Sequence, residues 1–388
     1  MASHLGQRIA TARRTRRMSQ DALARAAHVS LSMLRKVEQG ARIPSDDTLE
    51  AIAGALGMDP GRLLPSHDPS GSRMRDSLPG ISAAIAAYDL DLGTPAPPLA
   101  RLRVQVEEAM AYRLASQYSR LAAIAPTLLT DAVAALHASA GPDRQAAARL
   151  LTSAARSADA VAYKAGGRDL SARLIDLMRW AAVQAEDPLL EAVCSYVRAE
   201  TFFAARAHTA GLRALETAID AAPTGGAKES ATLGALHMRA AVLAARDGNA
   251  DSATAHISEA RTLGDGVPEG VYQGTAFGPE SVRIHQVSLA VSLGGDHITS
   301  ALSLAREWKP SGNLPAERRS GFYIELAVGQ LAAGRTDDAF ESLKVARSIA
   351  PQHTREHPWA RETAGTLRRL KRADADSLTS YAEWIGAV

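Results

Sequence analysis

The chain has 388 residues, of which 46% are apolar, 4% aromatic and 22% charged. This length is too great for one compact core and favours two or three domains. The apolar set is dominated by alanine, which forms helices well and strands poorly, so we expect an all-α fold. A formal net charge of only +2 argues against a protein that coats nucleic acid or membrane uniformly.

The expected location follows from three features of the sequence. We find no run of about 18 apolar residues, so no membrane span and no membrane partner are predicted. The basic N-terminus is not followed by an apolar segment, so no signal peptide is expected. Cys194 is the only cysteine, which excludes an intrachain disulfide, and we expect it in the core. Together these features predict a cytoplasmic protein.

Positive charge is concentrated at the N-terminus. Residues 1–42 contain nine Lys or Arg and two acidic residues, a local balance of +7. A basic lobe on a near-neutral chain is typical of a dedicated nucleic-acid-binding domain. A solvated basic helix or a disordered tail would give the same charge. The pattern of apolar residues therefore has to distinguish a folded nucleic-acid-binding domain from these alternatives.

Residues 3–64 are predicted to form five short helices. Ser19 and Ser30 each precede an apolar helical pattern, where a serine side chain can cap the first turn, and Pro44 and Ser45 open a fourth helix. Gly40 suits the left-handed position that follows a helix end. Such a set of short, capped helices is large enough for one small domain.

A linker is expected at residues 66–98, between a first domain at 1–65 and a second domain at 99–388. Its first half is rich in Pro, Ser, Gly and Asp, and a proline-rich break follows at 93–98. A short helix is expected near 81–90, and it could pack on either domain.

The third predicted helix, from Ser30 to Gln39, has two different faces. Leu34 and Val37 form its core-facing pair. The opposite face carries Leu31, Ser32, Arg35, Lys36 and Gln39. A helix that exposes such groups can lie in the major groove of DNA.

Each group on that face has a plausible partner on DNA. Arg35 and Lys36 can donate hydrogen bonds to guanine O6 and N7. Ser32 can bind a base or a phosphate. Leu31 can contact a thymine methyl, or it can pack within the domain instead.

The first domain resembles the Cro/repressor (XRE) family of helix-turn-helix proteins. The resemblance rests on Leu5-Gly6, Ile9, Arg13, Met18-Ser19-Gln20, Leu23-Ala24, Val29-Ser30, Leu34, Val37-Glu38-Gln39-Gly40, Arg42, Pro44, Leu49, Ile52-Ala53 and Leu56-Gly57. These residues occupy nearly every framework position of the family, over about 15% of the chain.

The resemblance implies roles for four further residues. Gln20 matches a glutamine that clamps a DNA phosphate, at a helix N-terminus whose amides favour the same anion. Arg42 matches a position that contacts the DNA backbone. Arg13 and Glu38 match an ion pair inside the domain and are therefore expected to be structural. Family members usually bind inverted-repeat operators as dimers, so we expect a homodimer formed by the long domain.

From about residue 99 onward, helical patterns follow one another with no convincing strand. Breaks made of small and polar residues recur about every 40 residues, at 206–210, 247–253, 294–301 and 333–339. This spacing is close to the period of helical-hairpin repeats. We therefore predict a tetratricopeptide-like solenoid, with an irregular helical bundle as the alternative.

The second domain resembles the tetratricopeptide-like regions of actinobacterial XRE regulators. The resemblance rests on Ala162-Tyr163-Lys164, Met178-Arg179-Trp180-Ala181-Ala182, residues 234–241 and Thr275-Ala276-Phe277-Gly278-Pro279. Many of those proteins continue the last motif with an asparagine, where this chain has Glu280-Ser281-Val282. The architecture is also similar to peptide-pheromone receptors, which hold a peptide with asparagines. This chain has only Asn249 and Asn313, so it departs from that pattern too.

A ligand channel is predicted beside the longest irregular stretch, residues 264–278. Such a loop inside a solenoid is a reasonable rim for a pocket. The candidate channel residues are Arg239, Tyr272, Arg283 and His285. Ordinary packing between repeats and solvated charge is the alternative, and for each residue taken singly it is the favoured explanation.

We find no phosphate-binding glycine loop, no nucleophilic serine motif and no set of metal ligands, so no enzyme, cofactor or metal is expected. The sequence instead predicts a sequence-specific regulator that binds double-stranded DNA and responds to a peptide, small molecule or protein. The alternative is a DNA-binding interaction scaffold, antitoxin-like or developmental, without a small ligand.

Overall fold

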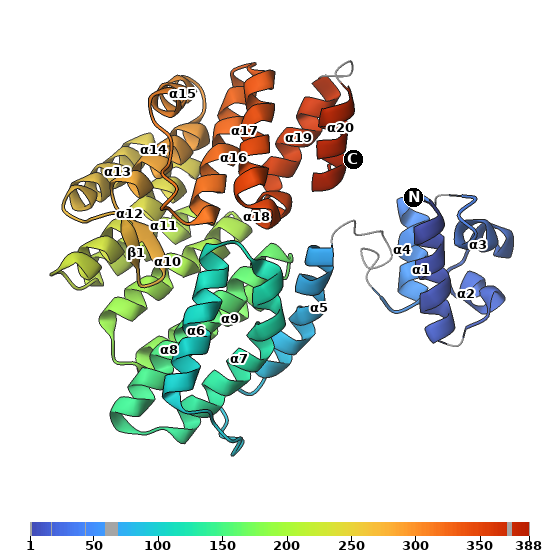
Figure 1. Ribbon diagram of the computed structural model, residues 1–388, viewed down its shortest axis with the longest axis horizontal. Coiled ribbons are helices and arrows are strands. Elements are labelled where there is room, and N and C mark those ends of the chain that lie inside the picture. The colour runs from blue at the N-terminus through green and yellow to red at the C-terminus, as the bar shows by residue number, and fades with distance from the viewer. Residues whose placement is uncertain (1, 17, 43, 59–68, 371–374, 388) are drawn as a thin grey trace. The chain divides into compact units, whose positions relative to one another are not determined.

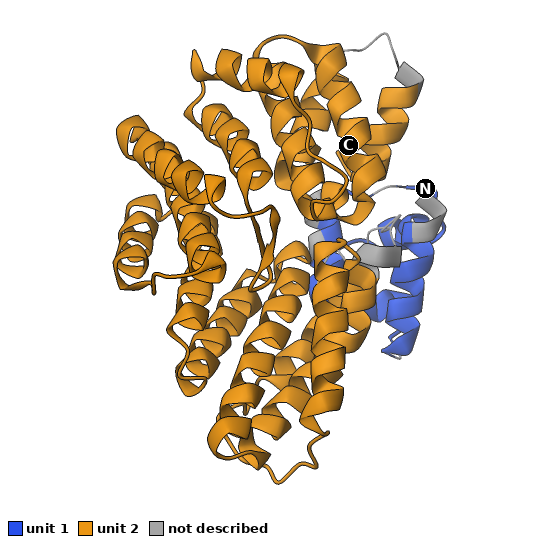
Figure 2. Ribbon diagram, turned by 60° about the vertical axis from the view of Figure 1, so that its left-hand side comes forward, with its two compact units in different colours: residues 1–72 blue, residues 73–388 orange. Residues whose placement is uncertain are grey.

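The computed structural model describes residues 2–16, 18–42, 44–58, 69–370 and 375–387. Within these ranges the chain forms two compact units, residues 1–72 and 73–388 (Figure 2). Regular structure in the described ranges is almost entirely helical, with two strands of three residues each. The prediction of an all-α fold is therefore confirmed.

The N-terminal unit contains four described helices: α1 (Ala2–Thr15), α2 (Gln20–Ala26), α3 (Leu31–Glu38) and α4 (Asp46–Ala55) (Figure 1). Ser19, Ser30 and Ser45 cap α2, α3 and α4, and each side chain accepts a hydrogen bond from a backbone N–H in the first turn. The sequence predicts the caps at Ser19 and Ser30, and it predicts a helix start at Ser45. The fifth predicted helix, ending near Leu64, lies outside the described residues.

Helix α1 passes very close to the end of α3. The core between the helices includes Ile9, Leu34 and Val37, each at most 1% exposed. A Cβ atom built on Gly6 would lie 2.3 Å from the carbonyl oxygen of Val37 and 2.5 Å from that of Glu38. Glycine at this position therefore sets how tightly α1 can pack against α3.

Alanine at Gly6 is expected to destabilise the N-terminal unit by about 1–3 kcal/mol, because the added methyl group meets backbone atoms that cannot rotate away. The measurement is amide hydrogen exchange of α1 and α3 in the full chain, which should become faster. Alanine at Gly54, which has open space around it in α4, is the matched control. It should slow exchange, because alanine favours a helix over glycine by up to about 1 kcal/mol.

Part of the expected linker is a helix, and most of this helix belongs to the second unit. Helix α5 spans Pro69–Ala84, and the segment continues as turns to residue 90. Met74, Ile81 and Ile85 are buried in the core of the second unit. Their spacing of seven and four residues puts them on one helix face. Composition suggested a linker because the Pro, Ser and Gly residues conceal this apolar stripe, and Pro79 stands inside the helix.

The second unit is a series of antiparallel helical hairpins. Its remaining helices are α6 (Leu99–Leu114), α7 (Tyr118–Ala138), α8 (Gly141–Lys164), α9 (Arg168–Gln184), α10 (Pro188–Ala205), α11 (His208–Ala221), α12 (Ala227–Arg246), α13 (Ala250–Asp265), α14 (Pro279–Leu293), α15 (His297–Glu307), α16 (Ala316–Ala332), α17 (Thr336–Ile349), α18 (Pro351–Glu356), α19 (Pro358–Leu370) and α20 (Ala375–Ile385).

The first helices of successive hairpins pack on one another and form a row. Helix α6 packs on α8. Further along the chain, α10 packs on α12, α12 on α14, α14 on α16 and α16 on α19. Each also packs on the second helix of its own hairpin, as α12 does on α13 and α16 on α17 (Figure 1). Helical hairpins stacked on one another in this way form a solenoid, so the prediction of a tetratricopeptide-like repeat architecture is confirmed.

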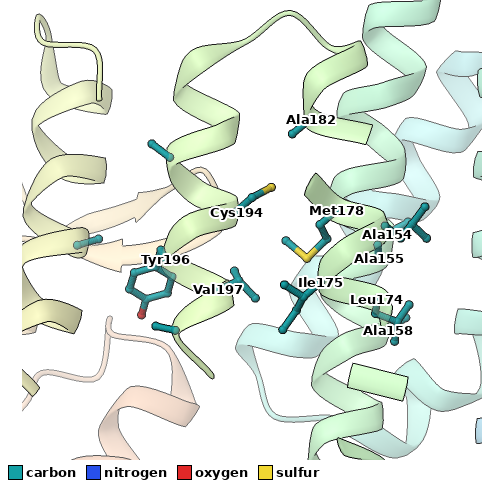
Figure 3. Close-up of a cluster of buried hydrophobic side chains, with 14 of the residues drawn as sticks. Ala154, Ala155, Ala158, Leu174, Ile175, Met178, Ala182, Cys194, Tyr196 and Val197 are labelled. Atoms are coloured by element: carbon teal, nitrogen blue, oxygen red, sulfur yellow. The ribbon is translucent and has the colours of Figure 1, made fainter. Parts of the chain in front are cut away.

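Helix α10 has a core side and a cavity side. Cys194 and Val197 point toward Ile175 and Met178 of α9, whereas Tyr196 points away from them (Figure 3). Cys194 is buried, as predicted, and burial raises the pKa of its thiol to about 12. The same helix thus contributes to the hydrophobic core and presents a polar side chain elsewhere.

One helix bears on the prediction that the chain has no membrane span. Within the described residues, α7 is long and apolar enough to cross a bilayer, with a mean hydropathy of 1.5 over its best window. Half of that window is buried inside the protein, and α7 packs against α6 and α8. A core helix of a repeat domain meets the same criteria of length and composition, so this finding is weak evidence for a membrane span.

The irregular stretch before α14 contains a β-hairpin that the sequence did not reveal. Strands β1 (Gly270–Tyr272) and β2 (Thr275–Phe277) are antiparallel, with Tyr272 opposite Thr275. Gln273 and Gly274 form the turn and have φ angles of 47° and 74°, as a two-residue hairpin turn requires. Strands of three residues beside several glycines give too short an alternating pattern to be recognised.

Candidate nucleic-acid interface and inner cavity

Helix α3 presents a polar face that its own apolar side holds in place. Leu34 and Val37 are 0% and 1% exposed and pack in the core of the N-terminal unit. Ser32, Arg35 and Lys36 are exposed on the other side. The sequence predicts this separation of a core-facing side and an exposed polar side, and the three exposed side chains are not part of the hydrophobic core.

Leu31 lies at the edge of the α3 face. Its side chain is partly buried and packs against the core of the N-terminal unit, which favours a role in packing over a contact with thymine. Arg42 follows α3 and is exposed, so its guanidinium can reach a phosphate beside the helix.

Arg13, Glu38 and Gln20 form one hydrogen-bonded network. Arg13 donates from Nε to Glu38 Oε1 at 2.7 Å and from Nη2 to Oε2 at 3.0 Å. Its Nη1 donates to the carbonyl of Met18 at 2.8 Å. The side chains of Arg13 and Glu38 are only 12% and 5% exposed. Burial by itself raises the pKa of Glu38, but hydrogen bonds from Arg13 and Gln20 outweigh it, and the pKa lies below its ordinary value.

Gln20 has a partner that the sequence did not suggest. Its Nε2 donates to Glu38 Oε2 at 2.7 Å, whereas the family resemblance implied that it holds a DNA phosphate. A side-chain amide carries two N–H donors, so one donor is committed to the network and the other is available. The same glutamine can therefore connect the internal ion pair to a phosphate.

The second unit encloses a cavity of about 620 Å³, which we call the inner cavity. Its lining residues come mainly from the row of first helices. They include Arg113 of α6, Arg156, Asp159 and Lys164 of α8, Tyr196 and Glu200 of α10, Arg239 and Arg246 of α12, His285 of α14, Glu317, Arg318 and Glu325 of α16, His353 and Glu356 of α18, His357 between α18 and α19, and Arg361 of α19. Residues about 40 positions apart thus meet on one surface, as a stack of repeats requires.

The inner cavity is strongly basic. Nine Lys or Arg and five Asp or Glu line it, a surplus of four positive charges. Burial raises the pKa of Glu325 to about 7 and that of Asp159 well above its ordinary value, so the acidic residues compensate even less. Burial also lowers the pKa of His285 and of His357 to about 3, which leaves both neutral near pH 7.

A cluster around Tyr196 shows how the cationic groups are held. Arg239 forms an ion pair with Glu200 at 3.2 Å and lies over the ring of Tyr196, 4.5 Å from its centroid. Arg318 donates to the hydroxyl of Tyr196 at 2.6 Å and to Nε2 of His285 at 3.2 Å. These hydrogen bonds fix the arginine side chains before any ligand arrives, which reduces the entropy lost on binding.

Tyr196 is expected to ionise near pH 8. Burial by itself raises its pKa, but Arg239, Arg318 and Arg156 together lower it to about 8. The measurement is the ultraviolet difference spectrum of tyrosinate as the pH rises from 7 to 9, and Tyr196→Phe should remove this first step. Tyr323→Phe is the control, because burial raises the pKa of Tyr323. A first step that survives Tyr196→Phe would show that the arginines do not act on this hydroxyl.

Two of the four predicted channel residues line the inner cavity and two do not. Arg239 and His285 are among its lining residues, whereas Tyr272 and Arg283 are not. The hydroxyl of Tyr272 donates to the carbonyl of Pro268 at 2.8 Å. Arg283 is exposed and lies 5.7 Å from the ring of Trp308. Tyr272 and Arg283 therefore lie outside the lining of this cavity, and the channel role of all four residues stays a prediction.

Sequence reasoning missed most of the cavity, including Arg113, Arg156, Tyr196 and Arg318. The signal in the sequence that could have indicated these residues is a charged or aromatic residue that recurs on the first helix of each predicted hairpin. Within the described residues, no group of three or more His, Cys, Asp or Glu is arranged to hold a metal ion.

Comparison with known proteins identifies the N-terminal unit. Residues 4–64 match the family described as helix-turn-helix domain. The immunity repressor protein of Bacillus phage phi105 is 46% identical over 54 residues, which make up 14% of this chain and 38% of the repressor. The N-terminal unit is therefore a helix-turn-helix domain similar to that of a phage repressor. The chain spans about two fifths of the length of that relative.

Solved structures resemble the chain more distantly. PlcR from Bacillus thuringiensis, in complex with the peptide PapR7 and DNA, is 15% identical, with a TM-score of 0.33 over 68% of this chain and 94% of PlcR. The apo form of the competence regulator ComR from Streptococcus vestibularis is 14% identical, with a TM-score of 0.32 over 96% of this chain and 99% of ComR.

Proposed function

We propose that this protein is a sequence-specific DNA-binding transcription regulator in which α3 reads the major groove. The observation that carries the proposal is the polar face of α3 within a helix-turn-helix domain. Ser32, Arg35 and Lys36 are exposed there, while Leu34 and Val37 anchor the helix. Arginine and lysine are suited to guanine O6 and N7, and serine to a base or a phosphate.

Contacts to the DNA backbone would orient α3 in the groove. Arg42 lies just beyond α3 and is exposed. Gln20 opens α2, where helix amides favour a phosphate, and it keeps one amide N–H beyond its bond to Glu38. Backbone contacts of this kind set the register of a helix on DNA without reading its sequence.

We infer that the regulator acts as a homodimer on an inverted-repeat operator. Helix α3 has eight residues and can read only a short half-site, so a second copy would supply the affinity and specificity of a full operator. Analytical ultracentrifugation of the full chain with and without operator DNA tests this inference. A monomer that binds an asymmetric site with full affinity would contradict it.

The inner cavity is proposed to bind the effector. Its arginines are held by hydrogen bonds, its volume is about 620 Å³, and its charge surplus favours an anionic ligand. An acidic peptide, an anionic small molecule or an acidic segment of a partner protein would each meet these requirements.

Selection of bound duplexes from a random DNA pool tests the proposed function directly. The purified full chain should enrich one sequence family with two-fold symmetry. Repeating the selection with a fractionated cell extract should change the yield if an effector alters DNA binding. A pool that stays random after several rounds at low salt would contradict the proposal, because low salt favours every phosphate contact.

A further inference from the structure

The β-hairpin between α13 and α14 reaches two buried arginines on distant helices. We call Gln273 and Gly274 the hairpin tip. Arg113 of α6 donates from Nη2 to the carbonyl of Gly274 at 2.8 Å. Arg156 of α8 donates from Nη1 to the carbonyl of Gln273 at 2.7 Å and from Nη2 to the hydroxyl of Thr275 at 2.7 Å. More than a hundred residues of sequence separate these partners.

In the described part of the chain, no carboxylate lies within ion-pair distance of either arginine, although Glu317 and Glu200 act on Arg113 and Glu200 acts on Arg156 at longer range. Arg113 and Arg156 are 8% and 9% exposed, and within the described residues neither forms an ion pair with a carboxylate. Nε of Arg113 is buried without a hydrogen-bond acceptor in the same part of the chain. Burial and the neighbouring Arg113 lower the pKa of Arg156 to about 9. Buried charges are normally paired, so this pair is left with neutral acceptors where an anion would bind better.

The nearest carboxyl group on α8 does not compensate for them. Asp159 is 3% exposed and accepts a hydrogen bond from the hydroxyl of Ser171 at 2.5 Å. Burial is the main reason that its pKa lies well above the ordinary value, so it does not act as a counter-charge.

The hairpin tip separates two cavities. A second cavity of about 280 Å³ lies beside the inner cavity. Arg113, Arg156 and Gly274 line both of them. Moving the tip would therefore join the two spaces and expose both guanidinium groups to a ligand in the joined groove.

The hairpin is anchored at its base by buried apolar packing, whereas its tip is held by the hydrogen bonds from Arg113 and Arg156. Phe277 is fully buried, at a place where Gly234 of α12 leaves room for its ring. The side chain of Glu269 accepts hydrogen bonds from the backbone N–H groups of Glu280 and Ser281, at 2.8 and 2.9 Å. At the tip, by contrast, Gln273 has a φ of 47°, a conformation that is unfavourable for residues other than glycine and asparagine.

We propose that Arg113 and Arg156 form a binding site for an anionic group of the effector, a carboxylate or a phosphate, and that the hairpin tip closes this site until the effector displaces it. The proposal deepens the proposed function, since it rests on effector binding in the inner cavity. Displacement exchanges neutral carbonyl acceptors for an anion, which adds the attraction between opposite charges to the hydrogen bonds of the arginines.

The test uses the full chain and three probes: inorganic phosphate, and tetraglutamate and tetraglutamine peptides that are acetylated at the N-terminus and amidated at the C-terminus. We expect calorimetric binding of phosphate, of tetraglutamate or of both, and none of tetraglutamine. The anion that binds identifies the source of the charge. Binding should also speed amide hydrogen exchange in residues 270–277, because the tip leaves its arginine partners.

Three variants separate the proposed site from the rest of the molecule. Arg156→Gln should weaken anion binding by at least about tenfold, the loss that corresponds to one charge-assisted contact. Gln273→Asn should weaken it by about threefold to tenfold, because asparagine followed by glycine favours the hairpin turn and keeps the site closed. Arg179→Gln removes an exposed arginine of α9 that pairs with Asp176 and does not line the inner cavity, so binding should be unchanged.

The outcomes distinguish this proposal from the proposed function. The proposed site is overturned if Arg156→Gln binds anions as tightly as wild type does. It is also overturned if anion binding leaves the amide hydrogen exchange of residues 270–277 unchanged. Failure of both anions to bind overturns it as well. DNA binding is measured on the same preparations, and its presence in these cases leaves the proposed function standing. A thermal unfolding curve like that of wild type establishes that each variant is folded.

Discussion

Alanine at both Arg35 and Lys36 is expected to abolish the preference of the protein for its selected operator over unrelated duplex DNA. Both side chains are exposed on α3, and a good contact to a base edge contributes about 1–3 kcal/mol of discrimination. Losing two such contacts would bring specific binding close to non-specific binding. Stability should change little, because neither side chain belongs to the core formed by Leu34 and Val37.

The measurement compares dissociation constants for the operator and for a scrambled duplex at one salt concentration. Arg25→Ala is the control, because Arg25 is 76% exposed and pairs with Asp21 on α2. It removes a positive charge from the same unit but none from α3, so the preference for the operator should persist. Full selectivity in the Arg35, Lys36 variant would show that another face of the domain reads the bases.

Most of the N-terminal unit could be predicted because its signals are local. Ser19, Ser30 and Ser45 stand next to the helices that they cap, and Leu34 and Val37 are three residues apart on one face. The bond between Gln20 and Glu38 joins residues eighteen positions apart. No local pattern indicates such a bond, and the family resemblance assigned Gln20 to DNA alone.

The inner cavity could be predicted only in part because its residues come from many repeats. The sequence suggests that hairpins stack, but the face of each first helix that turns inward depends on packing between repeats. Arg283 and His285 illustrate the problem on α14. They are two residues apart, about 200° around a helix, so His285 faces the cavity while Arg283 is exposed.

The hairpin illustrates a different limit. Its base depends on Gly234, where a Cβ atom would lie 2.0 Å from the ring of Phe277. Its tip depends on Arg113 and Arg156, which are more than a hundred residues away in sequence. A short strand that is stabilised by distant partners leaves almost no trace in its own sequence.

Replacement of Glu38 by glutamine is expected to destabilise the N-terminal unit by about 3–5 kcal/mol, the usual cost of leaving one charge of a buried ion pair unmatched. Arg13 would keep its positive charge at a side chain that is 12% exposed and lose its anionic partner. The substitution also replaces one carboxylate oxygen of Glu38 with an NH2 group, which cannot accept the hydrogen bond that Gln20 now donates. Denaturant unfolding, followed by hydrogen exchange of α1 and α3, measures the loss.

Two further variants show whether the buried pair is the cause. Asp21→Asn removes the carboxylate of an exposed pair, in which Asp21 is 54% exposed, and should cost less than about 1 kcal/mol. Arg13→Met combined with Glu38→Leu removes both charges of the buried pair. It should be more stable than Glu38→Gln alone, because no charge is left unmatched. A double variant as unstable as the single one would point to packing instead.

The pH dependence provides an independent check on the same pair. Glu38 has a lowered pKa in the folded protein, so it binds its proton more readily in the unfolded chain. Its contribution to stability is therefore complete above the pKa of an unfolded glutamate, about 4.3, and is lost as the pH falls through the lower folded pKa. Wild type should lose stability in the N-terminal unit over this acidic range. Glu38→Gln should lose less there, because its uncharged side chain has no proton to gain.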